Sequence, residues 1–190
     1  DGWTQRTLKA GVKDAGMSPD MALRAFAGGI PDLVDHWADW ADRRMLDDLA
    51  AQDLAAMRIR DCITAAVKAR LQVMDHHPEA ARRLFAYLAL PPNAPLAARL
   101  TWRTVDVMWY AAGDDASDFN YYTKRGLLAP VYTTTALCWL ADTSDGHADT
   151  WAYLDRRIAD VMKVPAIMSR IKAALSSLPR PSRIFRRARN

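Results

Sequence analysis

Residues 4–29, TQRTLKAGVKDAGMSPDMALRAFAGG, decide the expected fold because they contain two short helices separated by a glycine turn. Thr4 and Ser18 each precede a helical sequence, and their side-chain oxygens can accept hydrogen bonds from its first amide groups. Pro19 stands at the first position of the second helix, where proline is well tolerated. Gly16 can end the first helix in a left-handed conformation. The pattern predicts a helix-turn-helix unit.

The remaining segments also favour helix, because apolar residues recur at spacings of three and four positions and no alternating strand pattern competes. Pro31 and Pro78 stand where two further helices are expected to begin, and residues 91–95, PPNAP, form a firm break. Pro130 falls inside another expected helix, which we expect it to kink. The chain of 190 residues is long enough to bury a core. We therefore expect an all-α domain.

Three parts are expected along the chain: a helix-turn-helix-like part at 1–48, a helical body at 49–163 and a terminal segment at 164–190. The terminal segment has an apolar helical stripe followed by a basic tail. Two interpretations stay open, a last core helix or an amphipathic helix that lies on a membrane with its basic residues near anionic headgroups. The residues that a membrane helix would use are Ile167, Met168, Arg170, Ile171, Lys172, Leu175 and Leu178.

The positive charge of the chain is concentrated at its end. The last eleven residues hold five arginines and no acid, whereas the formal net charge of the whole chain is +4. Such a tail favours an anionic partner, either a membrane surface or nucleic acid. The sequence contains no unbroken apolar run of the roughly 18 residues that a transmembrane helix requires. It begins at Asp1, and we expect residues upstream of Asp1 to have been removed.

The chain lacks the local motifs of most enzyme classes. Glu79 is its one glutamate, so a glutamate-rich di-iron site cannot be assembled. Its four histidines show no zinc-ligand spacing, and no phosphate loop or nucleophile elbow is present. Cys62 and Cys138 lie among apolar residues, which is typical of reduced, buried thiols. We expect no catalytic residue, no metal and no cofactor, and therefore no enzymatic activity.

Residues 109–125, WYAAGDDASDFNYYTKR, gather aromatic residues around an acidic turn and end in a cationic pair. Tyr121 and Tyr122 are adjacent on a helix, so the two rings cannot both face one core. At least one ring is expected to point elsewhere. An exposed aromatic side chain near Arg125 is typical of a protein-protein or lipid contact.

The helix-turn-helix pattern resembles the DNA-binding domain of TetR-family regulators. Residues 18–28 offer one base, Arg24, against Asp20, and acids outnumber bases in residues 29–53. Because phosphate affinity grows with the number of cations presented, this surface is a poor match for DNA. Basic residues on the first helix are the counter-evidence. We expect a vestigial helix-turn-helix that binds no nucleic acid.

Several short motifs are distributed along residues 2–162: GWT at 2–4, AGMSP at 15–19, DLVDHW at 32–37, AGD at 112–114, SDFN at 117–120, YTKR at 122–125 and DTW at 149–151. Together they resemble one family, the ubiquinone-biosynthesis accessory lipid-binding protein, which is the ninth coenzyme-Q biosynthesis protein. The resemblance covers roughly residues 2–162.

The resemblance implies a TetR-like all-α homodimer that has lost DNA binding and ends in an amphipathic membrane helix. It also implies a hydrophobic pocket for a phospholipid or polyprenyl quinone among the C-terminal helices. A di-iron hydroxylase that modifies demethoxy-ubiquinone is the implied partner. By this resemblance the hydroxylase would dock on Asp118, Tyr121, Tyr122 and Arg125.

A quinone with a long isoprenoid tail is nearly insoluble in water, so its carrier must supply a closed apolar cavity. Two neighbouring helices offer side chains for such a cavity, although each one taken singly could be ordinary core. The candidate lining residues are Trp102, Val105, Met108, Trp109, Leu127, Leu128, Val131, Leu137 and Trp139.

These observations predict a non-enzymatic accessory factor of ubiquinone biosynthesis that presents lipid to the hydroxylase at an anionic membrane surface. In a bacterium it would be cytoplasmic and peripheral to the inner membrane, and in a eukaryote it would lie on the matrix face. The alternative is a TetR-type ligand-responsive transcriptional repressor, which would share the fold but bind duplex DNA.

Overall fold

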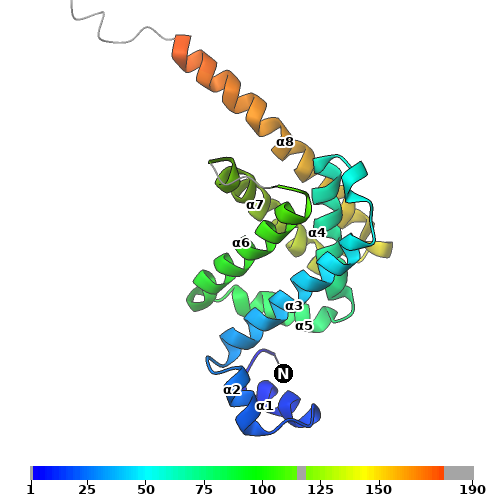
Figure 1. Ribbon diagram of the computed structural model, residues 1–190, viewed down its shortest axis with the longest axis vertical. Helices are drawn as coiled ribbons and strands as arrows, with labels where there is room; N and C mark the ends of the chain where they lie inside the picture. Colours follow the sequence, from blue (N-terminus) through cyan, green and yellow to red (C-terminus); the bar gives the residue numbers. More distant parts are fainter. Residues whose placement is uncertain (1, 115–118, 178–190) are drawn as a thin grey trace, which may run out of the picture.

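The structure, a computed structural model, describes residues 2–114 and 119–177, with side chains described at 2–114 and 120–163. Within these ranges every regular element is an α-helix or a short 3-10 helix, and no strand is present. The expectation of an all-α fold is confirmed. Figure 1 shows two small N-terminal helices below a larger helical body.

The N-terminal unit forms as its capping residues predict. Helix α1 (Gln5–Asp14) begins at Thr4, whose hydroxyl accepts a hydrogen bond from the amide of Thr7 at 3.3 Å. Helix α2 (Pro19–Ala25) begins at Ser18, whose hydroxyl accepts from the amide of Met21 at 3.2 Å. Between them Gly16 adopts a φ of +65°, a left-handed conformation that glycine reaches without strain.

The body is built from six further α-helices, joined by short turns. Their bounds are α3 (Ile30–Ala50), α4 (Ile59–Asp75), α5 (Pro78–Leu88), α6 (Ala94–Ala111), α7 (Phe119–Ala141) and α8 (Ala148–Ser177). The 3-10 helices are Leu54–Ala56, Pro91–Asn93 and Asp145–His147. Pro130 lies inside α7, which remains one helix from end to end.

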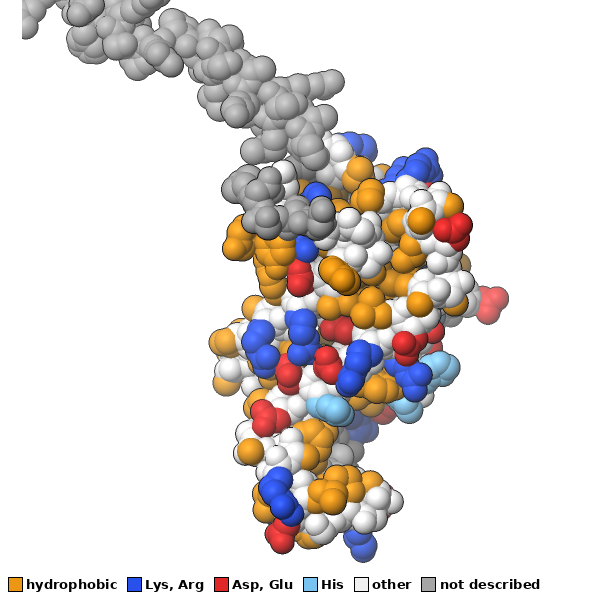
Figure 2. Space-filling model, in the orientation of Figure 1, with side chains coloured by type: hydrophobic (Ala, Val, Ile, Leu, Met, Phe, Trp, Pro, Cys, Tyr) orange, Lys and Arg blue, Asp and Glu red, His pale blue; other side chains and the backbone are white. Residues whose placement is uncertain are grey.

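Helix α4 lies at the centre of the body and packs against α3, α6, α7 and α8 (Figure 1). Its buried face carries Val67, Leu71 and Met74, which belong to one hydrophobic cluster with Met108 on α6 and Leu154 on α8. A smaller cluster fills the junction of α3, α5 and α6. Figure 2 shows charged side chains of both signs interspersed across the middle of one face.

A buried polar network joins three of these helices. The Asp42 carboxylate on α3 accepts hydrogen bonds from Arg70 Nε on α4 at 2.7 Å and from Thr104 Oγ1 on α6 at 3.0 Å. The side chains of Asp42 and Arg70 are 5% and 4% exposed. A buried charge without a partner is costly, so each of these groups requires the others in place. The network therefore fixes the relative positions of α3, α4 and α6.

The turn between α7 and α8 is organised by Asp142. Its carboxylate accepts hydrogen bonds from the amide and hydroxyl groups of both Ser144 and Thr150. These hydrogen bonds, led by those from Ser144, hold the pKa of Asp142 below its ordinary value. The ionised carboxylate thus ties the start of α8 to the end of α7.

Helix α8 continues across residue 164, where the sequence suggested the start of a separate terminal segment. Its first turns pack against α4 and α7, and Figure 1 shows its last turns extending away from the other helices. Among the described residues, no helix combines the length and apolar character needed to cross a bilayer.

Candidate docking and lipid site

Arg125 on α7 joins the two helices at the corner between α6 and α7 through ion pairs. Its Nε donates a hydrogen bond to Asp106 Oδ1 on α6 at 2.5 Å, and its Nη1 donates to Asp114 Oδ2 at 3.0 Å. The Arg125 side chain is only 3% exposed. The sequence analysis expected this guanidinium beside an exposed aromatic ring, as part of a contact surface. The structure shows the Arg125 side chain buried in ion pairs, and its role in a contact surface stays a prediction.

The charges at this corner are mutually stabilised. Burial acts to raise the pKa of Asp114, but hydrogen bonds from Lys124 and Arg125 hold that pKa below its ordinary value. Burial likewise acts to lower the pKa of Arg125, but hydrogen bonds to Asp106 and Asp114 keep it above its ordinary value. Asp114 and Arg125 are therefore both ionised at neutral pH, and their ion pair joins α7 to the end of α6.

Above these ion pairs lies an aromatic patch, which we define as Trp102, Tyr121 and Tyr122. The Tyr121 and Tyr122 rings meet edge to face with centroids 5.0 Å apart, and Trp102 lies 6.4 Å and 6.3 Å from them. The Arg125 guanidinium carbon lies 3.6 Å from the centre of the Tyr121 ring. Tyr122 is 63% exposed. The expectation that one of the adjacent tyrosines points away from the core is confirmed.

Asp118, the fourth residue expected on the docking surface, lies outside the described residues. Conversely, sequence reasoning missed Asp106 and Asp114 as the partners of Arg125. The signal for Asp114 was present, since it stands in the AGD motif at 112–114 just before the turn that leads to Arg125. The role of Asp106 depends on the packing of α6 against α7 and leaves no local signal.

Five of the nine candidate lipid-lining residues come together. Val105 and Met108 on α6 and Leu128, Val131 and Trp139 on α7 are buried in the main hydrophobic cluster. The Trp139 indole also donates a hydrogen bond to Asp75 Oδ1 at 2.9 Å. These side chains fill the space between the two helices and α4 and α8.

The other four candidates are not fully buried. Trp109 is half-buried and packs against the same cluster. Leu127 is half-buried, and Trp102 is half-buried within the aromatic patch. Leu137 is 53% exposed on α7, away from the buried group.

The candidate membrane residues lie on the last turns of α8. The backbone of 164–177 is helical, but the side chains of Ile167, Met168, Arg170, Ile171, Lys172 and Leu175 lie outside the described part of the structure. Leu178 lies beyond the described residues altogether.

The second helix of the N-terminal unit presents few cations. Arg24 and Asp20 are exposed on α2, beside Leu23, which is 69% exposed. One exposed base and one exposed acid make a weak phosphate-binding surface. In the described part of the chain, no group of three His, Cys, Asp or Glu side chains is placed to hold a metal ion, and both cysteines are free thiols.

Residues 94–165, which span α6, α7 and the first turns of α8, match the family model described as COQ9. Through these residues the chain is similar to the COQ9 family. It is 32% identical over 188 residues to a Rattus norvegicus protein named ubiquinone biosynthesis protein COQ9, mitochondrial, covering 93% of this chain and 59% of that protein. A Homo sapiens protein of the same name is 31% identical over 188 residues, covering 93% of this chain and 58% of that protein. The chain thus spans less than two thirds of the length of these relatives.

A solved structure with a similar fold is that of a TetR transcriptional regulator from Nitrosomonas europaea ATCC 19718. It superimposes with a TM-score of 0.65 at 20% identity, over 82% of this chain and 85% of the regulator. The expected TetR-like fold is therefore confirmed. At this level of identity the likeness concerns the fold alone.

At the α6–α7 corner, replacing the buried Arg125 is expected to destabilise the protein more than replacing the exposed Tyr122. Arg125→Met leaves Asp114 buried without its guanidinium partner, and we expect it to lower the free energy of unfolding by about 3 kcal/mol. Tyr122→Ala removes a largely exposed ring and is expected to cost less than about 1 kcal/mol. Urea unfolding followed by circular dichroism measures both. Equal losses would contradict the division into a buried support and an exposed patch.

Proposed function

We propose that this chain is a non-enzymatic, lipid-binding accessory factor of ubiquinone biosynthesis. It binds a polyprenyl quinone intermediate or phospholipid at a membrane and presents it to the di-iron demethoxy-ubiquinone hydroxylase. The observation that carries the proposal is the exposed aromatic patch held over a buried arginine. The names of the rat and human relatives support the pathway.

The aromatic patch has the properties of a protein-binding hot spot. Tyrosine and tryptophan bury a large area for little loss of side-chain entropy when they are already fixed in place. Tyr121 is fixed by its contact with Arg125, and Tyr122 leans on both Tyr121 and Trp102. We propose that the hydroxylase covers Tyr122 first, with Tyr121 at the edge of the contact and Arg125 as the positioning residue beneath it. For Asp118, which lies outside the described residues, the docking role rests on the family resemblance alone.

The docking proposal predicts that Tyr122→Lys weakens hydroxylase binding by about 2 kcal/mol or more, because it places a charge where the partner buries a ring. Binding is measured by isothermal titration with the purified hydroxylase. Tyr110→Lys is the matched control, because Tyr110 is also an exposed tyrosine, 77% exposed, but lies outside the aromatic patch. Equal affinity of the Tyr122→Lys variant and the unmodified protein would exclude this surface.

Helix α7 offers a way for lipid to reach the buried side chains beneath it. Pro130 has no amide hydrogen, so the carbonyl of Gly126 receives no hydrogen bond from position 130. The next turn is also modified, because the Thr134 hydroxyl donates to the Pro130 carbonyl at 2.7 Å. Helices are most easily distorted where their internal hydrogen bonds are missing. This weak segment contains Leu127 and Leu128 and adjoins Val131.

We propose that the apolar tail of the lipid enters between residues 126 and 130, where α7 is most easily distorted. The tail then displaces side chains of the main hydrophobic cluster between α6 and α7, which we call the α6–α7 cluster. The proposed lining is the set identified from the sequence, with Leu137 and the half-buried residues near the surface and Val105, Met108 and Val131 deepest.

This route predicts that Pro130→Ala reduces the amount of co-purifying lipid, because it restores the missing hydrogen bond and stiffens α7. The free energy of unfolding is expected to rise, by up to about 3 kcal/mol. Mass spectrometry of organic extracts measures the lipid. Pro95→Ala, in the first turn of α6 where proline is tolerated, is the control. If no lipid co-purifies with the unmodified protein, the proposal that the protein carries lipid is contradicted. If the Pro130→Ala protein holds as much lipid as the unmodified protein, entry of lipid at residues 126–130 is contradicted.

We further propose that the last turns of α8 lie on the membrane, that the protein is a homodimer, and that it acts at the inner membrane. In a bacterium this is the cytoplasmic face and in a mitochondrion the matrix face. The continuous α8 supports this proposal, since its last turns extend away from the body (Figure 1) and carry an apolar stripe with flanking cations.

The membrane proposal predicts that Leu175→Asp abolishes flotation with liposomes that contain anionic phospholipid. The substitution puts a charge on the apolar stripe that would enter the acyl region. Ser176→Asp introduces the same charge one position away, off the stripe, and is expected to retain most of the binding. If both variants float as well as the unmodified protein, α8 is not the membrane contact.

A further inference from the structure

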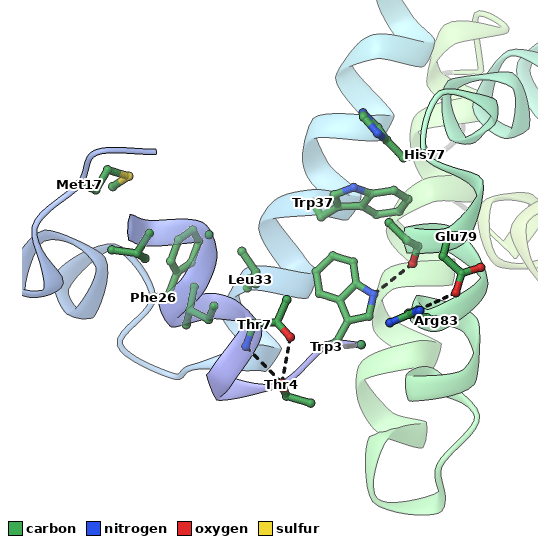
Figure 3. A pocket seen from close by; sticks show the side chains of 15 residues that line it. Trp3, Thr4, Thr7, Met17, Phe26, Leu33, Trp37, His77, Glu79 and Arg83 are labelled. Carbon is green, nitrogen blue, oxygen red and sulfur yellow. Dashed lines mark hydrogen bonds and ion pairs between the residues drawn. The ribbon is translucent and has the colours of Figure 1, made fainter. Parts of the chain in front are cut away.

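A hollow of about 640 Å³ lies where the N-terminal helices meet the body. Apolar side chains from four places in the chain line it: Trp3, Leu8 on α1, Phe26 after α2, and Leu33 and Trp37 on α3. Figure 3 shows Trp3 and Trp37 on one side of the junction, with Leu33 and Phe26 facing them. We call it the junction hollow. It is separate from the α6–α7 cluster.

Trp3 and Trp37 together form one wall of the junction hollow. Their rings meet edge to face with centroids 6.0 Å apart. The indole nitrogen of Trp3 donates to the carbonyl of Ala80 on α5 at 3.1 Å, so its hydrogen-bonding group is already satisfied. This bond also holds the Trp3 ring in place as one wall.

The apolar face of α1 is incompletely covered by the protein. No residue of α1 is buried, although Leu8 and Val12 point toward the body. A second hollow of about 430 Å³ lies beside the first and shares Leu8, Val12 and Phe26 with it. Figure 2 shows hydrophobic side chains at the surface of these N-terminal helices, at the bottom of the view. Covering such apolar surface is favourable by roughly 25 cal/mol per Å².

The size of the junction hollow suits a small molecule. Small-molecule pockets occupy about 300–1,000 Å³ and are mostly apolar with a few polar groups at defined positions. A protein partner would instead need a contact area on the order of 800 Å² on each side, which is more surface than one such hollow offers.

An ion pair lies at one end of the junction hollow. Glu79 and Arg83 on α5 form it at 2.6 Å, and Figure 3 shows them on the side opposite Met17 and Phe26. Arg82 does not line the junction hollow, but it also pairs with Glu79, at 3.8 Å. Because Glu79 is shared between two guanidinium groups, it neutralises Arg83 incompletely. An anionic group is favoured beside Arg83.

We propose that the junction hollow binds a single-chain anionic amphiphile. Its anionic group lies near Arg83, and its hydrocarbon runs between Trp3 and Trp37 toward Phe26. A ligand in this position contacts α1, α3 and α5 at once, so its binding stabilises the N-terminal unit against the body.

The test uses dodecanoic acid brominated at its terminal carbon, kept below its micelle concentration, because bromine quenches tryptophan fluorescence on contact. Gly11 lies on α1 at the wall of the junction hollow, and no atom lies within 4 Å of a Cβ placed there. Gly11→Phe therefore fills the junction hollow without a backbone clash. Gly11→Ala is the matched control, because both substitutions replace a helical glycine and only one adds bulk.

We expect Gly11→Phe to raise the dissociation constant about tenfold, since it excludes roughly two methylene groups from burial. Gly11→Ala should change it by less than about twofold. Equal quenching in the two variants would place the probe elsewhere, including at the α6–α7 cluster, and would overturn the proposal. The proposed docking and membrane functions use other surfaces, so this failure would leave them standing.

The anionic end has its own test with the alcohol of the same brominated chain. We expect the unmodified protein to bind the carboxylate several-fold more tightly than the alcohol, and Arg83→Gln to remove that preference while retaining affinity for the alcohol. Equal affinity of the unmodified protein for the two probes would overturn the assignment of an anionic ligand.

Discussion

The carboxylate of Asp42 is the single group on which the arrangement of the body depends most. It receives hydrogen bonds from α4 and α6 while it sits on α3, so three helices share one buried charge. Hydrophobic packing alone tolerates sliding between helices, but a buried charge with its specific donors does not. Because α6 is held in this way, the Asp106 side chain stands where Arg125 can reach it, and the α6–α7 corner forms. The position of the aromatic patch therefore depends on the Asp42 network, which lies on the other side of α6.

Local features of this fold could be predicted from the sequence, and features that depend on helix packing could not. The caps at Thr4 and Ser18 act within four residues, so their effect is visible in the sequence. The outward orientation of Tyr122 follows from its adjacency to Tyr121 and was equally predictable. The burial of Arg125 was not, because its partners lie 19 and 11 positions away and meet it only after α6 and α7 pack.

The same distinction explains why the junction hollow escaped sequence analysis. Leu8, Leu33 and Trp37 each occupy an ordinary apolar position of an amphipathic helix, which gives no sign that the space between them is unfilled. The junction hollow exists because α1 makes few contacts with α3 and α5. The hydrogen bond from Trp3 to the Ala80 carbonyl connects the start of the chain to α5. The candidate lipid residues show the reverse, since five of the nine residues chosen as cavity walls are buried in the core.

The continuity of α8 has a mechanical consequence. Its 30 residues make a rod of about 45 Å, anchored at one end by the Asp142 carboxylate. A rod pivoting at one end magnifies small rotations at the other. If lipid enters at Pro130 as proposed, a slight adjustment of α7 there would swing the far tip of α8 through a much larger arc, and loading of the lipid and the angle at which the protein meets a bilayer would become one coupled movement.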